Sequence, residues 1–358
     1  MARLELRLTR ALYNRHVDRL RTVRSVAVAG ALAGACAVAA CGGGKSTDGS
    51  TSAAGTSTAS NASAAFAPAR GRTIQDLRRG LARGPILAPT VSTLTPGDNR
   101  FGFGLFDRPY SQVDAARVAL YVERSGTSEV TGPFVASHES LAVAPRYQSA
   151  TVKGDPNAAR TLYVAHVRFP GPGTYAVLAI AKVGARTVAS DPIPVMVSAH
   201  DPVPAVGSLA PRIHTPTLAS VGGDVSQIDT RQPPDTMHGT DLFDAFRRKP
   251  VILLFATPAL CQSRVCGPVT DLAEEVKAES PKATFIHNEI YLDNTIKPGC
   301  LEGTRAQDQC VRPQVLAYHL PSEPWLFAID RHGRIVARIE GAFDKQELEA
   351  AVQRAVAR

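Results

Sequence analysis

Short runs rich in Val, Tyr, Phe and Leu recur between residues 86 and 200, and turns that contain Gly or Pro separate them. Runs of this length and composition are typical of β-strands. The pattern predicts strands over Arg100–Phe106, Ala116–Glu123, Thr161–Phe169, Thr174–Ala181 and Pro192–Ser198. We therefore expect an all-β domain over residues 86–200.

A different pattern begins at about residue 205, after the Pro-rich stretch 201–204. Val251–Phe255 is a continuous apolar run, as expected for a strand that is buried on both faces. Further strands are predicted over 284–290, Trp325–Ile329 and Ile335–Ile339, and helices over Asp241–Arg247, Pro268–Lys277, Pro313–Tyr318 and Lys345–Val356. The alternation of strands and helices predicts an α/β domain over residues 205–358.

The first forty residues have the pattern of an export signal. Residues 1–24 contain seven Arg against Glu5 and Asp18, a net charge of +5, and an uncharged run follows from Ser25 to Ala40. A basic segment before a short apolar stretch is typical of a secretory signal. The run is shorter than the ~20 residues of a comfortable membrane span. An uncleaved N-terminal anchor remains the alternative, and both interpretations export the protein.

The apolar run ends in Val38-Ala39-Ala40-Cys41, which resembles a bacterial lipobox. The resemblance implies a signal peptide over residues 1–40 and a lipid on Cys41. Cys36 is a poorer candidate because the hydrophobic residue three positions before it is missing. The Gly-, Ser-, Thr- and Ala-rich stretch that follows cannot bury enough surface to fold, so residues 41–85 are expected to be a flexible tether. The expected location is the extracytoplasmic face of the cell membrane.

Charge argues against a nucleic-acid partner. The formal net charge is +8, and removal of the +5 in residues 1–24 leaves about +3 for the mature chain. The high isoelectric point therefore comes mostly from a removable segment, and no nucleic acid is expected as a partner.

Four cysteines remain after Cys36 and Cys41 are set aside, and all lie in the last hundred residues. An even number in an oxidising compartment indicates two disulfides. The first two stand in Phe255-Ala-Thr-Pro-Ala-Leu-Cys261-Gln-Ser-Arg264-Val-Cys266-Gly-Pro268. A buried strand that enters a cysteine loop at a helix start resembles the thioredoxin/peroxiredoxin superfamily, although the spacing is Cys-x4-Cys instead of Cys-x-x-Cys.

This resemblance covers about residues 206–358, including an entry segment Gly207-x-x-Ala210-Pro211. It implies a thioredoxin-like fold, Cys261 as the attacking thiol and Cys266 as the resolving thiol. Arg264 would add positive potential between them. Pro324 would be the cis-proline that faces the redox cysteines.

Two positions depart from the family pattern. Leu254 occupies the place of a buried Asp that relays protons in thioredoxins, and Glu323 stands before the cis-proline where an apolar residue is usual. Glu323 is expected at the edge of the Cys261 pocket, where its carboxylate would disfavour the thiolate and could replace the missing relay. The alternative is a solvent-facing loop residue. The spacing around Cys261 and Cys266 fits neither a peroxidase nor a copper chaperone, although His287 and His319 could supply the later histidine that a copper chaperone needs.

Cys300 and Cys310 enclose a small polar insertion, and a disulfide there would stabilise the fold by about 2–3 kcal/mol through loop closure. We expect this pair to be structural. In the β domain, Gly173-Thr-Tyr175 resembles the tyrosine corner of an immunoglobulin-like sandwich. Asp235 and His238 lie three residues apart in a loop and are interpreted as a turn, so neither a metal ion nor a cofactor is expected.

The sequence thus predicts a two-domain protein, an immunoglobulin-like β-sandwich followed by a thioredoxin-like α/β domain. Its predicted function is membrane-anchored thiol–disulfide exchange with a thiol or disulfide protein as substrate. The alternative is a non-catalytic envelope lipoprotein, in which both disulfides brace the fold and the β-sandwich binds a partner.

Overall fold

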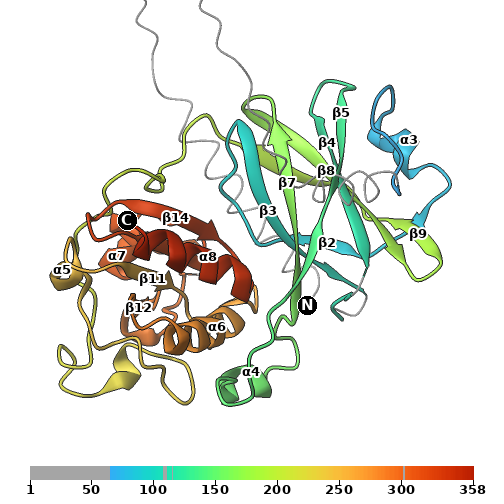
Figure 1. The fold of residues 1–358 in the computed structure, drawn as a ribbon. Helices are drawn as coiled ribbons and strands as arrows, with labels where there is room; N and C mark the ends of the chain where they lie inside the picture. Colours follow the sequence, from blue (N-terminus) through green and yellow to red (C-terminus); the bar gives the residue numbers. More distant parts are fainter. Residues whose placement is uncertain (1–64, 108–110, 115, 301–302) are drawn as a thin grey trace, which may run out of the picture.

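The structure is a computed structural model that describes residues 65–107, 111–114, 116–300 and 303–358. The expected signal peptide and Cys41 lie outside the described residues. The described chain is mostly β-sheet with few helices and forms two lobes side by side, a β lobe and a C-terminal lobe (Figure 1). Among the described helices, none has the length and apolar character needed to cross a membrane.

Two sheets make up the β lobe. One has the strand order β1-β9-β8-β4-β5, with β10 also paired to β8, and the other has the order β2-β3-β7-β6. Their bounds are β1 (Ala82–Arg83), β2 (Ile86–Pro89), β3 (Gly97–Phe106), β4 (Arg117–Arg124), β5 (Val130–Val135), β6 (Ser137–Ser140), β7 (Thr161–Phe169), β8 (Gly173–Val183), β9 (Arg186–Ala189) and β10 (Ile193–Val197).

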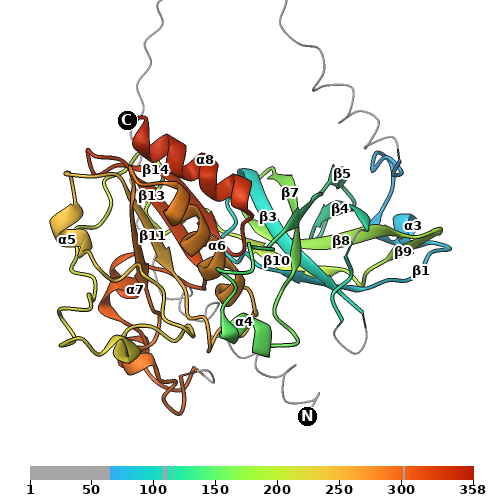
Figure 2. The ribbon, with the colours of Figure 1, turned by 60° about the horizontal axis from the view of Figure 1, so that its bottom comes forward.

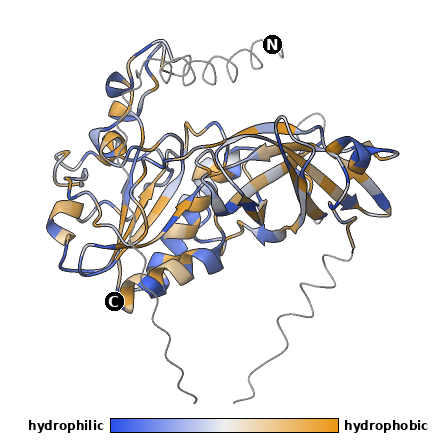
Figure 3. Ribbon diagram, turned by 90° about the horizontal axis from the view of Figure 1, so that it is seen from above, coloured by the Kyte–Doolittle hydropathy of each residue, from blue (hydrophilic) through white to orange (hydrophobic). Residues whose placement is uncertain are grey.

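The core of the β lobe lies between these sheets. It is built from the inward-facing aliphatic and aromatic residues of β3, β4, β7 and β8, among them Phe103, Tyr163 and Tyr175. The hydroxyl of Tyr175 donates a hydrogen bond of 2.8 Å to the carbonyl of Gly171, just upstream. Figure 3 shows apolar colouring along the strands of both lobes.

The segment 65–83 corrects the expectation of a tether that extends to residue 85. Phe66, Ile74 and Leu77 are buried against the outer face of β4 and β8. A short helix α3 (Ile74–Arg78) begins at a capping box, in which Thr73 and Asp76 satisfy each other's backbone N–H groups. Because these apolar side chains cover an otherwise exposed sheet face, this stretch folds onto the lobe.

The C-terminal lobe has one four-stranded sheet of order β12-β11-β13-β14. β11 pairs parallel with β12 and antiparallel with β13. The element bounds are η2 (Val225–Gln227), α5 (Leu242–Ala245), β11 (Val251–Phe255), α6 (Cys266–Glu279), β12 (Thr284–Asn288), η3 (Leu292–Asn294), η4 (Gln307–Gln309), α7 (Pro313–Ala317), β13 (Trp325–Ile329), β14 (Ile335–Glu340) and α8 (Lys345–Val356).

Most of these bounds lie within two residues of those predicted from the pattern. β11 is fully buried along its length, which explains why its sequence is a continuous apolar run. α8 begins where its cap predicts, because the Asp344 carboxylate accepts a hydrogen bond from the Glu347 N–H. Helices α6 and α8 pack on one face of the sheet, as Figure 2 shows.

Polar contacts join the two lobes. Ser92 donates to Glu340 at the end of β14, and Arg100 pairs with Glu347 of α8. A second helix of the β lobe, α4 (Ala150–Gly154), lies against the start of α6 (Figure 2). A side chain at Gly267 would meet Val152 of that helix, so glycine permits this close approach.

Candidate functional site

Cys261 and Cys266 form a disulfide at the point where β11 leads into α6. Cys266 is the first residue of α6, and Cys261 lies in the turn that follows Thr257. Because Cys266 is the first residue of α6, the positive end of the helix dipole lies at the disulfide. The residue before the helix, Val265, makes no side-chain capping hydrogen bond there.

The two sulfurs differ in their surroundings. Cys266 is completely buried, whereas Cys261 is 4% exposed and its sulfur lies 3.2 Å from the hydroxyl of Ser263. The loop residues between them, 262–264, are exposed. A molecule that approaches from solvent therefore meets Cys261 before Cys266.

Glu323 lies beside the buried sulfur. The Glu323–Pro324 peptide bond is cis, the geometry that the family resemblance implies. The nearest sulfur to the Glu323 carboxyl is Cys266, at 3.4 Å from Oε2, whereas the sequence placed Glu323 by Cys261. All three groups still lie within 4.8 Å of one another. Glu323 is partly buried and is not a solvent-facing loop residue.

The surroundings of Glu323 favour its protonated form. Burial, followed by the negative charge of Glu289, raises the pKa of Glu323 to about 8, although hydrogen bonds from Thr257 act in the opposite direction. In the disulfide form the carboxyl group therefore favours its protonated state, close to the Cys266 sulfur.

Two other positions named from the sequence have different surroundings from those expected. Arg264 is half-exposed, and its guanidinium pairs with Asp155 of the β lobe at 3.2 Å, which offsets its charge. Leu254 is buried in the same apolar cluster as Cys261 and Cys266. The side chain at this position is therefore apolar and shielded from water.

The second disulfide joins Cys300 to Cys310. Cys310 is buried in the cluster on the other face of the sheet, together with Val311 and Tyr318. The bridge closes the insertion that precedes α7. It lies in a different hydrophobic cluster from the Cys261–Cys266 disulfide.

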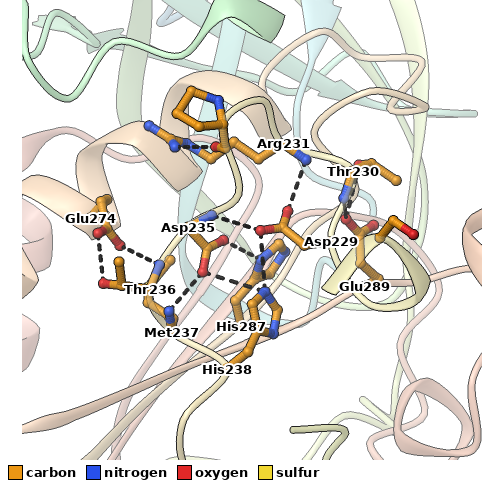
Figure 4. Close-up of polar contacts among 12 residues, drawn as sticks. Asp229, Thr230, Arg231, Asp235, Thr236, Met237, His238, Glu274, His287 and Glu289 are labelled. Atoms are coloured by element: carbon orange, nitrogen blue, oxygen red, sulfur yellow. Dashed lines mark hydrogen bonds and ion pairs between the residues drawn. The ribbon is translucent and has the colours of Figure 1, made fainter. Parts of the chain in front are cut away.

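A second group of buried titratable side chains contacts the chain just before the cysteine loop, at the Ala256 carbonyl. Figure 4 shows its members. It consists of Asp229, Asp235, His238 and His287, all at most 7% exposed. His287 is the fourth residue of β12, and the other three belong to the loop before α5. We call this group the Asp–His cluster.

Within the Asp–His cluster, Asp235 and His287 form an ion pair. The Asp235 carboxylate lies 2.6 Å from Nδ1 of His287, and Nε2 of the same ring lies 3.0 Å from the carbonyl oxygen of Ala256. Burial works to lower the pKa of His287, but the Asp235 carboxylate outweighs it and raises the pKa. His287 also lowers the pKa of Asp235, against the effect of burial.

Glu289 and Thr230 link this region to the redox loop. One oxygen of Glu289 accepts hydrogen bonds from the backbone and hydroxyl of Thr230. The Thr230 hydroxyl in turn accepts from the N–H of Ala259, two residues before Cys261. Burial raises the pKa of Glu289. The loop that carries the Asp–His cluster thus supports the loop that carries the cysteines.

Sequence reasoning missed several residues of this site. Ser263 and Glu289 have no distinctive spacing, and Thr257 drew attention only for a peroxidase spacing to Cys261 that does not fit. Only the fold brings the three residues to the disulfide. Asp235 and His238 were noted in the sequence and interpreted as a turn. The other half of their cluster, Asp229 and His287, comes from positions that no short motif connects.

No protein-family model matches the chain, and no curated protein matches it. Five chains of solved structures match. One is assigned as a thiol:disulfide interchange protein DsbE from Chlorobium tepidum, with 18% identity over 43% of this chain and 99% of that chain, and a TM-score of 0.29. This likeness is too low to decide an activity.

Proposed function

We propose that the protein exchanges thiols and disulfides through Cys261 and Cys266. The observation that carries the proposal is the asymmetric disulfide at the start of α6: one sulfur lies under an exposed loop, and the other is buried against a carboxyl group. A disulfide that only braced the fold would not require a titratable group beside one of its sulfurs.

The exchange step follows from this asymmetry. In the reduced protein, the Cys261 thiolate attacks a substrate disulfide, so one S–S bond breaks, a mixed disulfide forms and a substrate thiolate leaves. Cys266, whose proton passes to the Glu323 carboxylate, then attacks the Cys261 sulfur. The second substrate thiolate leaves and the Cys261–Cys266 bond forms. The substrate gains two electrons, and the protein loses two.

Glu323 fits the role of proton carrier because of its raised pKa. After the exchange it is protonated, which matches its favoured state beside the disulfide. In the reverse direction the same proton passes to the departing Cys266 sulfur. The carboxyl group thus replaces the relay that Leu254 cannot provide.

We further propose that the C-terminal lobe, residues 205–358, is a thioredoxin-like domain and that residues 86–200 form an immunoglobulin-like sandwich. The cis bond at Pro324 and the strand–helix order support the first assignment. The hydrogen bond from Tyr175 to Gly171 has the geometry of a tyrosine corner and supports the second.

Single-cysteine variants test the proposal. Cys266→Ser should accumulate mixed disulfides through Cys261, because no thiol remains to resolve them. Cys261→Ser should accumulate none, because Cys266 is buried. Non-reducing gels of extracts that express each variant measure the adducts, and Cys300→Ser/Cys310→Ser is the control that leaves the redox pair intact. If neither single variant traps a partner, the non-catalytic alternative holds, with both disulfides bracing the fold.

The proposed location is the extracytoplasmic face of the membrane, with a lipid on Cys41. The order of basic, apolar and Val-Ala-Ala-Cys segments supports it. Cys41→Ser should leave the precursor unprocessed or release the protein from membranes on fractionation. An unchanged size and membrane fraction would exclude the lipidated form.

A further inference from the structure

His238 is a buried side chain without a hydrogen-bond partner. It is 4% exposed, and neither ring nitrogen makes a hydrogen bond. Its Nε2 points between two carboxylates and lies 3.4 Å from an oxygen of Asp229 and 3.4 Å from an oxygen of Asp235 (Figure 4). Because an unsatisfied buried polar group destabilises the fold, this arrangement requires a reason.

The ligand atoms of the Asp–His cluster surround a common point. One atom from each of Asp229, Asp235, His238 and His287 lies within 4.8 Å of the others. Two ligands at the usual 2.0–2.1 Å from a tetrahedral zinc ion lie about 3.3 Å apart. The two 3.4 Å separations at His238 match neighbouring ligands on such an ion, whereas the 2.6 Å hydrogen bond between Asp235 and His287 must open when a metal ion replaces its proton.

The other contacts of these residues orient them as metal ligands are usually oriented. Nε2 of His287 faces the Ala256 carbonyl, which leaves Nδ1 turned into the cluster. The carboxylate of Asp229 accepts from the backbone N–H groups of Arg231 and Asp235, and that of Asp235 accepts from the N–H of Met237. Outer contacts of this kind fix ligand geometry in metal sites.

We propose that Asp229, Asp235, His238 and His287 bind one divalent transition-metal ion, of which Zn²⁺ has the matching ligand preference. Binding replaces the proton shared by His287 and Asp235 and gives His238 its missing partner. All four ligands are protein side chains and are buried, so the site is closed and structural. It would hold the loop over residues 229–238 in place behind the cysteines.

The test uses the purified, untagged full chain with both disulfides intact and any free thiol alkylated without prior reduction, so that sulfur cannot bind metal. The chain is stripped with a chelator and titrated with Zn²⁺, and with Co²⁺ as a spectroscopic probe. We expect one equivalent of either metal per chain and the visible absorption of tetrahedral Co²⁺. Binding well below one equivalent to the folded wild-type chain would overturn the proposal.

Variants locate the metal. His238→Gln should weaken binding at least about tenfold, the scale on which even outer contacts of metal sites act. His332→Gln, in the exposed turn between β13 and β14, is the matched control and should bind as the wild type does. If His238→Gln does not fold, judged by circular dichroism, Asp229→Asn takes its place. Equal binding by the cluster variant and the control would exclude this site. None of these outcomes depends on thiol exchange.

Discussion

The two lobes bury different kinds of side chain. In the β lobe, the buried polar side chains among the described residues are Ser149, Ser190 and the hydroxyl-bearing Tyr121, Tyr163 and Tyr175, and none of the described buried side chains there is Asp, Glu, His, Lys or Arg. In the C-terminal lobe, buried charged or titratable side chains are common: Asp229, Arg231, Asp235, His238, Asp271, Glu275, His287, Glu289, Arg312, Asp330 and Glu340. Several of these groups pair with one another, as Arg231 does with Asp271.

The difference shows where chemistry is to be sought. Burial of an ionisable group costs free energy unless a partner compensates for it. Asp229, Arg231, Asp235 and His238 lie in the loop before α5, and His287 and Glu289 lie at the end of β12 and just after it. The other buried groups lie on α6, before α7, after β13 and on β14. The buried side chains of the β lobe are those of a packing core, whereas the C-terminal lobe also buries ionisable groups close to the cysteines.

The largest expected effect tests whether a buried ion pair of the C-terminal lobe contributes more to stability than an exposed ion pair of the β lobe. Arg231 and Asp271 form a 2.8 Å ion pair whose side chains are almost completely buried. Arg231→Met should lower the free energy of unfolding by about 3–5 kcal/mol, because Asp271 loses its counter-charge. Urea denaturation of the oxidised protein, followed by the fluorescence of Trp325, measures it.

The matched control is Arg168→Met in the β lobe, where the pair with Asp98 is exposed. An exposed pair contributes at most about 1 kcal/mol, so the control should change little. Similar losses in both variants would mean that the contrast in buried charge has no energetic basis.

A second, smaller effect concerns pH. The pKa of Glu323 is raised from 4.5 to about 8, so its burial favours folding while the group is protonated. This contribution is fully present below about pH 4.5 and is lost as the pH rises through about 8. The stability of the oxidised protein relative to Glu323→Gln should therefore fall across this window.

Glu129→Gln, at an exposed turn of the β lobe, is the control for this measurement. Its unfolding free energy should follow the wild type at every pH. A constant difference between wild type and Glu323→Gln across the window would show that Glu323 is ionised throughout, and would remove it as a proton carrier.

The smallest expected effect lies in the β lobe. Tyr175→Phe removes one hydrogen bond, to the Gly171 carbonyl, and should cost about 1 kcal/mol. Tyr163→Phe should cost more, because that buried hydroxyl donates to Val113 and accepts from the N–H of Ala116. Neither change should alter the trapping of partners by Cys266→Ser. A change in trapping would show that the β lobe shapes the redox site.

Elements with a strong apolar pattern could be predicted from the sequence. β7, β11, β13 and α8 have the predicted bounds, because each has a buried face or two. β6 could not be found, since its four residues Ser137–Ser140 are polar and mostly exposed. The fold of residues 65–83 was missed for a related reason: a few apolar side chains in a Gly-, Ala- and Arg-rich stretch acquire meaning only when a sheet face lies beneath them.

The candidate site likewise contains residues that the sequence could locate and contacts that it could not. Cys261, Cys266 and Pro324 could be located because each stands in a local motif next to a strand. The contact of Glu323 with the buried sulfur, and not with Cys261, depends on how the Pro324 loop meets α6, which spacing does not encode. The pairing of Arg264 with Asp155 depends on the other lobe and could not be inferred from a single domain.

The polar contacts between the lobes make the C-terminal lobe a poor candidate for transfer to another protein. Glu340, Glu347 and Asp271 accept hydrogen bonds from Ser92, Arg100 and Ser149 of the β lobe. Excision of residues 205–358 alone would remove these β-lobe donors from the three carboxylates and uncover apolar surface on α6. A different N-terminal module could serve only if it supplied the same three donors in the same places. We therefore expect the two lobes to be stable only together. A chimaera that joins the C-terminal lobe to another module at the linker, without these contacts, should be unstable.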